Sequence, residues 1–137
     1  MKHILECQWL DNMTFETELN GHKVIMDTDE SSGGNDRGPR PKDLTMASLA
    51  GCTGMDVISI LKKMQIIPDY FNILIEAELT EDIPQYYNKI NLIYEFKGTS
   101  LDLDKLDRAV FLSQEKYCPV SALLKFGAEL TYEIRIL

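Results

Sequence analysis

The sequence of 137 residues has little of what marks several classes of protein. Its three cysteines are few and odd in number, which does not suit a secreted disulfide framework, so we expect free thiols in a reducing cytoplasm. No apolar run reaches about 18 residues, and the first segment, MKHILECQWLDN, meets acids and amides too early for a signal peptide. The net charge of −8 disfavours nucleic acid and anionic membranes as partners.

Motifs for metal and phosphate chemistry are also scarce. The two histidines, His3 and His22, form no pair at metal-binding spacing with a cysteine or with each other, so no metal is expected. No serine lies in a G-x-S-x-G nucleophile elbow, and GGNDRG at 33–38 is neither a phosphate-binding loop nor a dinucleotide fingerprint. Only the cysteines remain as candidates for chemistry.

The composition is that of an ordinary globular protein. Hydrophobic residues make up 45% and charged residues 26% of the chain, which excludes wholesale disorder and a collagen-like repeat. A chain of this length falls inside the usual range for one folded domain. We therefore expect a single domain over residues 1–137.

The first third predicts three short strands, at 3–10, 13–19 and 23–28. Between the second and third strands, Asn20-Gly21 supplies the positive φ angles of a type I′ hairpin turn. The following segment, 29–41, has no apolar side chain except its prolines and is rich in turn formers. We interpret it as a flexible connector.

A long central helix is predicted over 42–67. Pro41 suits its first position, Asp43 its first turn and Lys62 its last turns, and Pro68 stops it. Around Cys52 the helix carries small or apolar residues on almost every side, which predicts burial all round. Because a helix of ~25 residues spans about 38 Å, a second subunit is the simplest cover for it.

The last half alternates between strands and helices. Strands are predicted at 70–79 and 86–98, a helix at 101–117, a short helix from Pro119 to about Phe126, and a final strand at 130–137. The order βββ-α-ββ-α-α-β predicts an α+β two-layer domain.

The three cysteines differ in context. Cys7, in a predicted strand, is interpreted as a small buried hydrophobe. Cys52 is flanked by Gly51 and Gly54, which either allow close packing or open an approach for a small ligand; the residues alone leave both open. Cys118 precedes Pro119 at a helix start, where free N–H groups favour a thiolate.

Two segments, GPRPKDLTMASLAGCTGMDVISILKK (38–63) and KYCPVSALL (116–124), resemble the two cysteine motifs of the OsmC/Ohr family of thiol-dependent hydroperoxide reductases. The order of elements fits this family along essentially the whole chain. The short loop before the helix places the chain nearest to the less characterised members. The resemblance implies an OsmC-like fold and an intertwined homodimer, with central helices packed back to back and active sites at the subunit interface.

The resemblance also implies a chemistry for the cysteines. Cys52 would attack the O–O bond of an organic hydroperoxide or of hydrogen peroxide and become a sulfenic acid, and Cys118 would resolve it as a disulfide. A dithiol reductant, of lipoyl type in the best-known branch, would restore both thiols. No metal, flavin, haem or other cofactor is implied.

The chain departs from the organic-hydroperoxide branch at two positions. That branch uses an arginine from the N-terminal strands and a glutamate at the start of the long helix, whereas here the first arginine is Arg37 and Lys42 stands at the glutamate position. Our candidate partner for the Cys52 thiolate is therefore Arg37, with Asp43 to orient it. Two alternatives to a peroxide reductase stay open: a weakly active or non-catalytic stress-associated binding protein, and a redox sensor.

Overall fold

The computed structural model describes residues 1–137, which form two compact units, Met1–Thr45 and Met46–Leu137. The order of elements confirms the predicted α+β order βββ-α-ββ-α-α-β and adds a short 3₁₀ helix (η1) and a π-helical segment (η2). The elements are β1 (Cys7–Asp11), β2 (Thr14–Leu19), β3 (His22–Met26), η1 (Glu30–Ser32), α1 (Pro41–Lys63), β4 (Tyr70–Leu79), β5 (Tyr87–Lys97), α2 (Leu103–Leu112), η2 (Ser113–Tyr117), α3 (Pro119–Leu124) and β6 (Glu129–Ile136).

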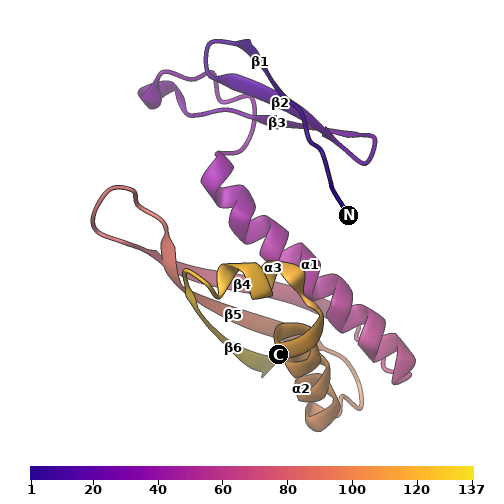
Figure 1. The fold of residues 1–137 in the computed structure, drawn as a ribbon. Coiled ribbons are helices and arrows are strands. Elements are labelled where there is room, and N and C mark those ends of the chain that lie inside the picture. The colour runs from indigo at the N-terminus through magenta and orange to yellow at the C-terminus, as the bar shows by residue number, and fades with distance from the viewer. The chain divides into compact units, whose positions relative to one another are not determined.

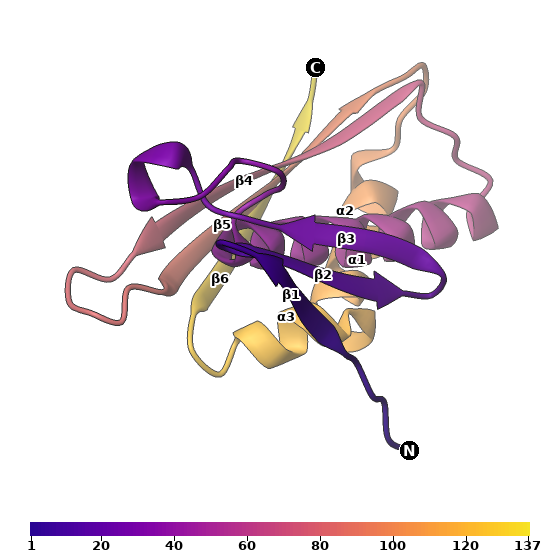
Figure 2. The same ribbon diagram turned by 90° about the horizontal axis from the view of Figure 1, so that it is seen from above.

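The first unit is built on a three-stranded antiparallel sheet in the order β1-β2-β3 (Figure 2). The turn between β2 and β3 is the predicted one, since Asn20 has φ 53° and Gly21 has φ 81°. These angles bring Leu19 opposite His22 and fix the register of the hairpin.

The segment after β3, predicted as a flexible connector, is tied down by hydrogen bonds. The buried carboxylate of Asp27 accepts from the Thr14 hydroxyl at 2.9 Å and from the main-chain N–H groups of Thr28 at 2.7 Å and Arg37 at 3.2 Å. Asp29 caps η1 by accepting from the N–H of Ser32 at 2.8 Å. The loop is thus folded around two aspartates.

Two glycines let this loop lie directly on β3 and its end. A Cβ atom at Gly34 would be 2.2 Å from the Thr28 carbonyl oxygen, and one at Gly38 would be 2.2 Å from the Ile25 carbonyl oxygen. Both distances are far inside van der Waals contact. Close packing within the first unit therefore explains these glycines.

The second unit places helices on one face of a three-stranded sheet (Figure 1). The central strand β5 pairs antiparallel with β4 and parallel with β6. As predicted, Ile90, Leu92, Tyr94 and Phe96 alternate along β5 and are buried. They form one core cluster with Leu49, Val57 and Leu61 of α1 and with Leu106, Ala109 and Val110 of α2.

The central helix is shorter than predicted. It begins at Pro41 and ends at Lys63, not at residue 67. Gln65 adopts a left-handed φ of 61°, its N–H bonds to the Lys62 carbonyl at 3.0 Å, and the N–H of Ile66 bonds to the Leu61 carbonyl at 2.9 Å. This is the Schellman termination, formed here without glycine.

Within the single chain α1 is buried on one side only, and the prediction that a second subunit covers the other side stays a prediction. Its fully buried residues, Leu49, Thr53, Val57 and Leu61, recur every four positions and form one inner stripe. Met55 is 77% exposed. By length and composition alone α1 could also cross a membrane, a test that core helices of soluble proteins pass as well.

The predicted helix over 101–117 is two elements. Asp102 caps α2 by accepting from the N–H groups of Asp104 and Lys105. After Leu112 the chain widens into η2, and the N–H of Cys118 bonds to the carbonyl of Ser113, five residues earlier, at 2.8 Å. Such π-helical turns are rare in proteins, and those that do occur often lie at functional sites.

Candidate thiol site

The structure brings Cys52 and Cys118 together. Cys52 lies near the middle of α1 and is half-buried, whereas Cys118 is the N-cap of α3 and is 3% exposed. Cys52 packs against the core cluster that contains Cys118, close enough for a hydrogen-bond interaction with the Cys118 side chain to raise the pKa of Cys52. Cys7 is exposed on β1, so its predicted role as a buried hydrophobe is wrong for the single chain.

The first turn of α3 directs N–H groups toward the thiols. The main-chain N–H of Ser121 lies 3.4 Å from the Sγ atom of Cys118, and the N–H of Val120 acts to lower the pKa of Cys52. Donors to sulfur favour the thiolate form. Sequence reasoning expected such donors for Cys118 alone and missed that α1 presents Cys52 to the same turn.

Burial raises the pKa of the Cys52 thiol above its ordinary value, and the hydrogen bond with Cys118 adds to this effect. The nearby negative charge of Asp56 acts in the same direction, while the Val120 N–H acts against it. Near neutral pH Cys52 is therefore protonated to a greater extent than an ordinary thiol.

Ser121 adds an unusual feature beside the pair. Its side chain is fully buried, and its hydroxyl oxygen has no hydrogen-bond partner. Buried polar groups are paired in most proteins, so an unpaired hydroxyl one turn into α3 calls for a functional explanation.

A buried polar network lies next to the thiols. The Thr53 hydroxyl is 2.7 Å from both the Tyr94 and the Ser113 hydroxyls. The side-chain amide of Gln114 donates to Thr53 at 3.1 Å and to Tyr94 at 2.9 Å. Burial raises the pKa of Tyr94 to about 12, so its hydroxyl stays protonated. Ser113 in turn donates to the Asp56 carboxylate at 2.9 Å.

The two glycines beside Cys52 differ. A Cβ atom at Gly54 would lie 3.2 Å from Cδ1 of Ile73 on β4, so close packing inside the unit explains this glycine. A Cβ atom at Gly51 would meet nothing within 4 Å. The sequence left two explanations open for these glycines, close packing or an approach for a small ligand. Close packing explains Gly54. At Gly51 no atom of the single chain packs closely, so an outside neighbour or a ligand stays open as the explanation.

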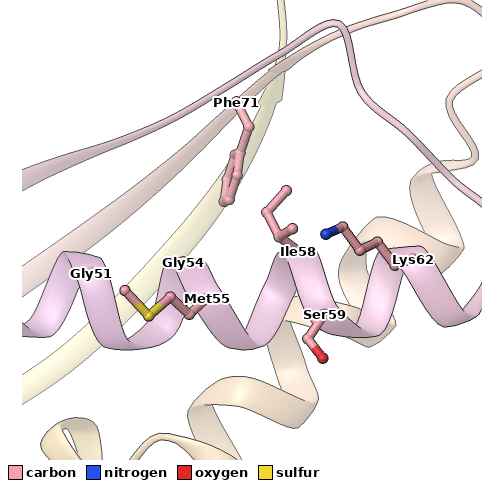
Figure 3. Close-up of a pocket in the computed structure, with 7 residues that line it drawn as sticks. All are labelled: Gly51, Gly54, Met55, Ile58, Ser59, Lys62 and Phe71. Carbon is pink, nitrogen blue, oxygen red and sulfur yellow. The ribbon is translucent and has the colours of Figure 1, made fainter.

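A groove of about 510 Å³ runs along the outer side of α1 near these glycines. Phe71 of β4 points toward the helix, and Ile58 and Lys62 point from the helix toward the same side (Figure 3). The lining is mostly apolar, with one lysine. The residues that line it are Gly51, Gly54, Met55, Ile58, Ser59, Lys62 and Phe71.

The predicted thiolate partner, Arg37, is engaged within the first unit. Its Nη1 atom lies 2.6 Å from the Asp11 carboxylate and 3.4 Å from the Thr14 hydroxyl. Asp43 occupies the first turn of α1, as predicted. Both residues belong to the unit Met1–Thr45, whereas the thiols belong to Met46–Leu137, and the roles assigned to Arg37 and Asp43 stay predictions.

The fold and the paired thiols define a small α+β protein with a dithiol site. The chain belongs to the OsmC-like protein family, whose profile matches residues 33–133. This match includes both segments on which the resemblance rested, and the family prediction is confirmed.

Individual relatives agree with this assignment. Protein YhfA of Escherichia coli K12 is 31% identical over 131 residues, covering 94% of each chain. A crystal structure of a hypothetical protein from Aquifex aeolicus is 27% identical, with a TM-score of 0.84, and the match covers 100% of this chain and 99% of that one. An organic hydroperoxide resistance protein OsmC from Legionella pneumophila shares the fold at 17% identity, with a TM-score of 0.70 and coverage of 98% and 97%.

Proposed function

We propose that this protein is a thiol-dependent peroxide reductase that acts on small organic hydroperoxides or hydrogen peroxide through Cys52 and Cys118. The observation that carries the proposal is the proximity of the two thiols, which lie in one core cluster, with the Ser121 N–H of α3 3.4 Å from the Cys118 sulfur. Cys52 is the more accessible of the two thiols and is the attacking one, and the buried Cys118 is the resolving thiol.

The reaction has three steps. The Cys52 thiolate attacks the terminal oxygen of the hydroperoxide, the O–O bond breaks, and the alkoxide takes up a proton and leaves as an alcohol; Cys52 is oxidised to a sulfenic acid. The Cys118 sulfur then attacks the sulfur of Cys52, an S–S bond forms, and the hydroxyl leaves as water. A dithiol reductant of the lipoyl class exchanges with the disulfide, is itself oxidised to a disulfide, and restores both thiols.

Family membership supports a stress-related redox role. Among the structurally similar proteins, those of Legionella pneumophila and Elizabethkingia anophelis are named as organic hydroperoxide resistance proteins. Their identities to this chain are 17% and 12%, so the names support the class of chemistry and not a particular substrate.

The proposed working form is a homodimer. The outer side of α1 carries the exposed Met55, the open surface at Gly51 and the apolar groove, and a second α1 helix is the occupant that fits a helix-length apolar face. Apolar burial at roughly 25 cal/mol per Å² makes such an interface stable at micromolar concentration.

A positive group near Cys52 would offset the burial that raises its pKa. We propose Arg37 for this role, with Asp43 to orient it. Arg37→Ala should slow the first step, measured as the rate of hydroperoxide loss in single turnover. Arg40→Ala is the matched control, because Arg40 lies in the same loop and pairs with Asp36 at 2.5 Å. Equal rates for both variants and the unaltered protein would remove Arg37 from the mechanism.

The raised pKa of Cys52 favours two alternatives, a weakly active or non-catalytic stress-associated binding protein and a redox sensor. The binding protein would consume hydroperoxide slowly or not at all, whereas the sensor would oxidise once and pass its disulfide to a partner without rapid turnover. Continuous consumption of hydroperoxide in the presence of a dithiol separates the reductase from both alternatives.

Cysteine variants test the order of the steps. Cys118→Ser should consume one equivalent of tert-butyl hydroperoxide and stop as a sulfenic acid on Cys52, which dimedone traps and mass spectrometry locates. Cys52→Ser should be inert on the same timescale, and Cys7→Ser should match the unaltered protein. Rapid oxidation of Cys118 in Cys52→Ser, with Cys52 untouched in Cys118→Ser, would reverse the assignment.

A further inference from the structure

Ser113 stands between the helix that carries Cys52 and the segment that leads to Cys118. Its side chain is fully buried at the junction of α2 and η2. Its hydroxyl lies 2.7 Å from Thr53 Oγ1 and donates to Asp56 Oδ2 at 2.9 Å. Both partners are on α1, and Thr53 directly follows Cys52. The side chain of Ser113 thus fastens η2 to the turn of α1 that bears Cys52.

The main chain of Ser113 makes the second connection. Its carbonyl accepts the N–H of Cys118 at 2.8 Å, across the wide turn of η2. An ordinary α-helical bond would end one residue earlier, so the π turn sets where Cys118 falls along the chain. One residue therefore touches α1 with its side chain and the backbone of Cys118 with its carbonyl.

The hydrogen bonds of Ser113 have a defined direction. The Asp56 carboxylate can only accept, so the Ser113 hydroxyl donates to it and must accept from Thr53. The Thr53 oxygen then accepts from Tyr94 and Gln114. The hydroxyls of Thr53, Tyr94 and Ser113 all have partners, which gives the connection a single geometry and little freedom to shift.

We propose that Ser113, bound to Thr53 and Asp56, is a positioning residue that holds Cys118 within bonding reach of Cys52. It touches neither sulfur through its side chain and acts through the backbone of Cys118. The inference rests on the thiol pair of the proposed function, but it concerns the geometry of the pair and not its reaction with peroxide.

Tyr94 offers a matched control. Its hydroxyl, like that of Ser113, makes two buried hydrogen bonds, to Thr53 at 2.7 Å and to Gln114 at 2.9 Å. Tyr94→Phe and Ser113→Ala each remove one hydroxyl and two bonds, so both should lower stability. Ser113→Ala removes two of the side-chain bonds from η2 to α1 and leaves that of Gln114 to Thr53, whereas Tyr94→Phe removes no bond between these two elements. A purely structural role predicts equal effects of the two variants on the thiols.

Phenylarsine oxide is a suitable probe because its affinity reports whether two thiols lie close enough to bind one arsenic atom, and because it does not oxidise them. Its arsenic forms one bond to each sulfur, and its oxygen leaves as water with the two thiol protons, so arsenic stays trivalent and no peroxide is needed. In a Cys7→Ser background only Cys52 and Cys118 can bind it as a pair. The affinity is measured by titration with loss of free thiols as the readout.

We expect the parent protein to bind one equivalent with loss of both thiols. Ser113→Ala and Thr53→Val should bind about tenfold more weakly, while Thr53→Ser, which keeps the hydroxyl, and Tyr94→Phe should stay within about twofold of the parent. Unchanged affinity in Ser113→Ala, equal weakening in Tyr94→Phe, or no pairwise binding by the parent would each overturn the proposal. Pairwise binding without any hydroperoxide consumption would instead refute the reductase function and leave the positioning role standing.

Discussion

The two sides of α1 have similar apolar composition and opposite surroundings. The inner stripe, Leu49, Thr53, Val57 and Leu61, is fully buried against β5 and α2. The outer side carries Met55, which is 77% exposed, and the groove beside it. The inner stripe therefore makes the fold of the unit, while the outer side is the surface on which we propose that a second α1 helix packs.

The largest effect is expected from the inner stripe. Leu61→Ala leaves a cavity in the core and should lower the free energy of unfolding by about 2–5 kcal/mol, measured by urea denaturation. Ile67→Ala is the control, because Ile67 lies just beyond the helix and is 84% exposed, and its change should stay within about 0.5 kcal/mol. Equal effects at the two positions would contradict the assignment of the inner stripe.

Charge on the outer side should break the dimer. Met55→Asp places a carboxylate where the second helix is proposed to pack, so light scattering at micromolar concentration should give a mass near 15.7 kDa in place of twice that value. Ile83→Asp, in the exposed turn after β4, should leave the dimer intact. If the unaltered protein is itself monomeric, the proposal that a second α1 helix packs on this side is refuted.

Alanine substitutions at Gly51 and Gly54 should change stability by smaller amounts that differ between the two positions. In a Met55→Asp background, Gly51→Ala should raise stability by about 0.5–1 kcal/mol, because a Cβ atom there meets nothing in its own chain. Gly54→Ala should gain less, since its Cβ atom would crowd Ile73 at 3.2 Å. In the dimer the sign at Gly51 should reverse if the second helix packs on it, which chemical denaturation at two protein concentrations detects.

The smallest effect concerns the pH dependence of Cys52. Asp56 helps to raise the pKa of this thiol, so Asp56→Asn should lower the pKa and increase the thiolate fraction near neutral pH. The rate of iodoacetamide labelling at Cys52, followed by mass spectrometry in a Cys7→Ser background, should then rise at lower pH than in the parent. Glu76→Gln, on β4, should leave the profile unchanged. A shift toward higher pH would contradict the charge effect.

Local patterns in the sequence predicted much of the fold. Asn20-Gly21 predicted the turn between β2 and β3, and the alternation along 86–98 identified the buried face of β5. The end of α1 was misplaced because Gln65 takes a left-handed conformation that glycine normally provides. The π turn at Ser113 was missed because a one-residue widening of a helix leaves the apolar pattern almost unchanged.

The thiol site was only partly predictable. The pairing of Cys52 with Cys118 came from the family resemblance, since no local motif joins cysteines in separate elements. Thr53, Tyr94 and Gln114 escaped notice because each reads as an ordinary helix or strand residue until the fold brings them together. The sequence carried only a weak signal for them: polar groups at positions where the helix or strand pattern predicts burial.

The central claim is that Cys52 and Cys118 form one peroxide-reducing pair. The most direct measurement is a free-thiol titration and intact mass of the unaltered protein before and after one equivalent of tert-butyl hydroperoxide. The account predicts that two of the three thiols disappear, the mass falls by the two hydrogen atoms lost in a disulfide, and peptide mapping joins Cys52 to Cys118. Three surviving thiols, or an oxygen adduct confined to Cys7, would contradict it.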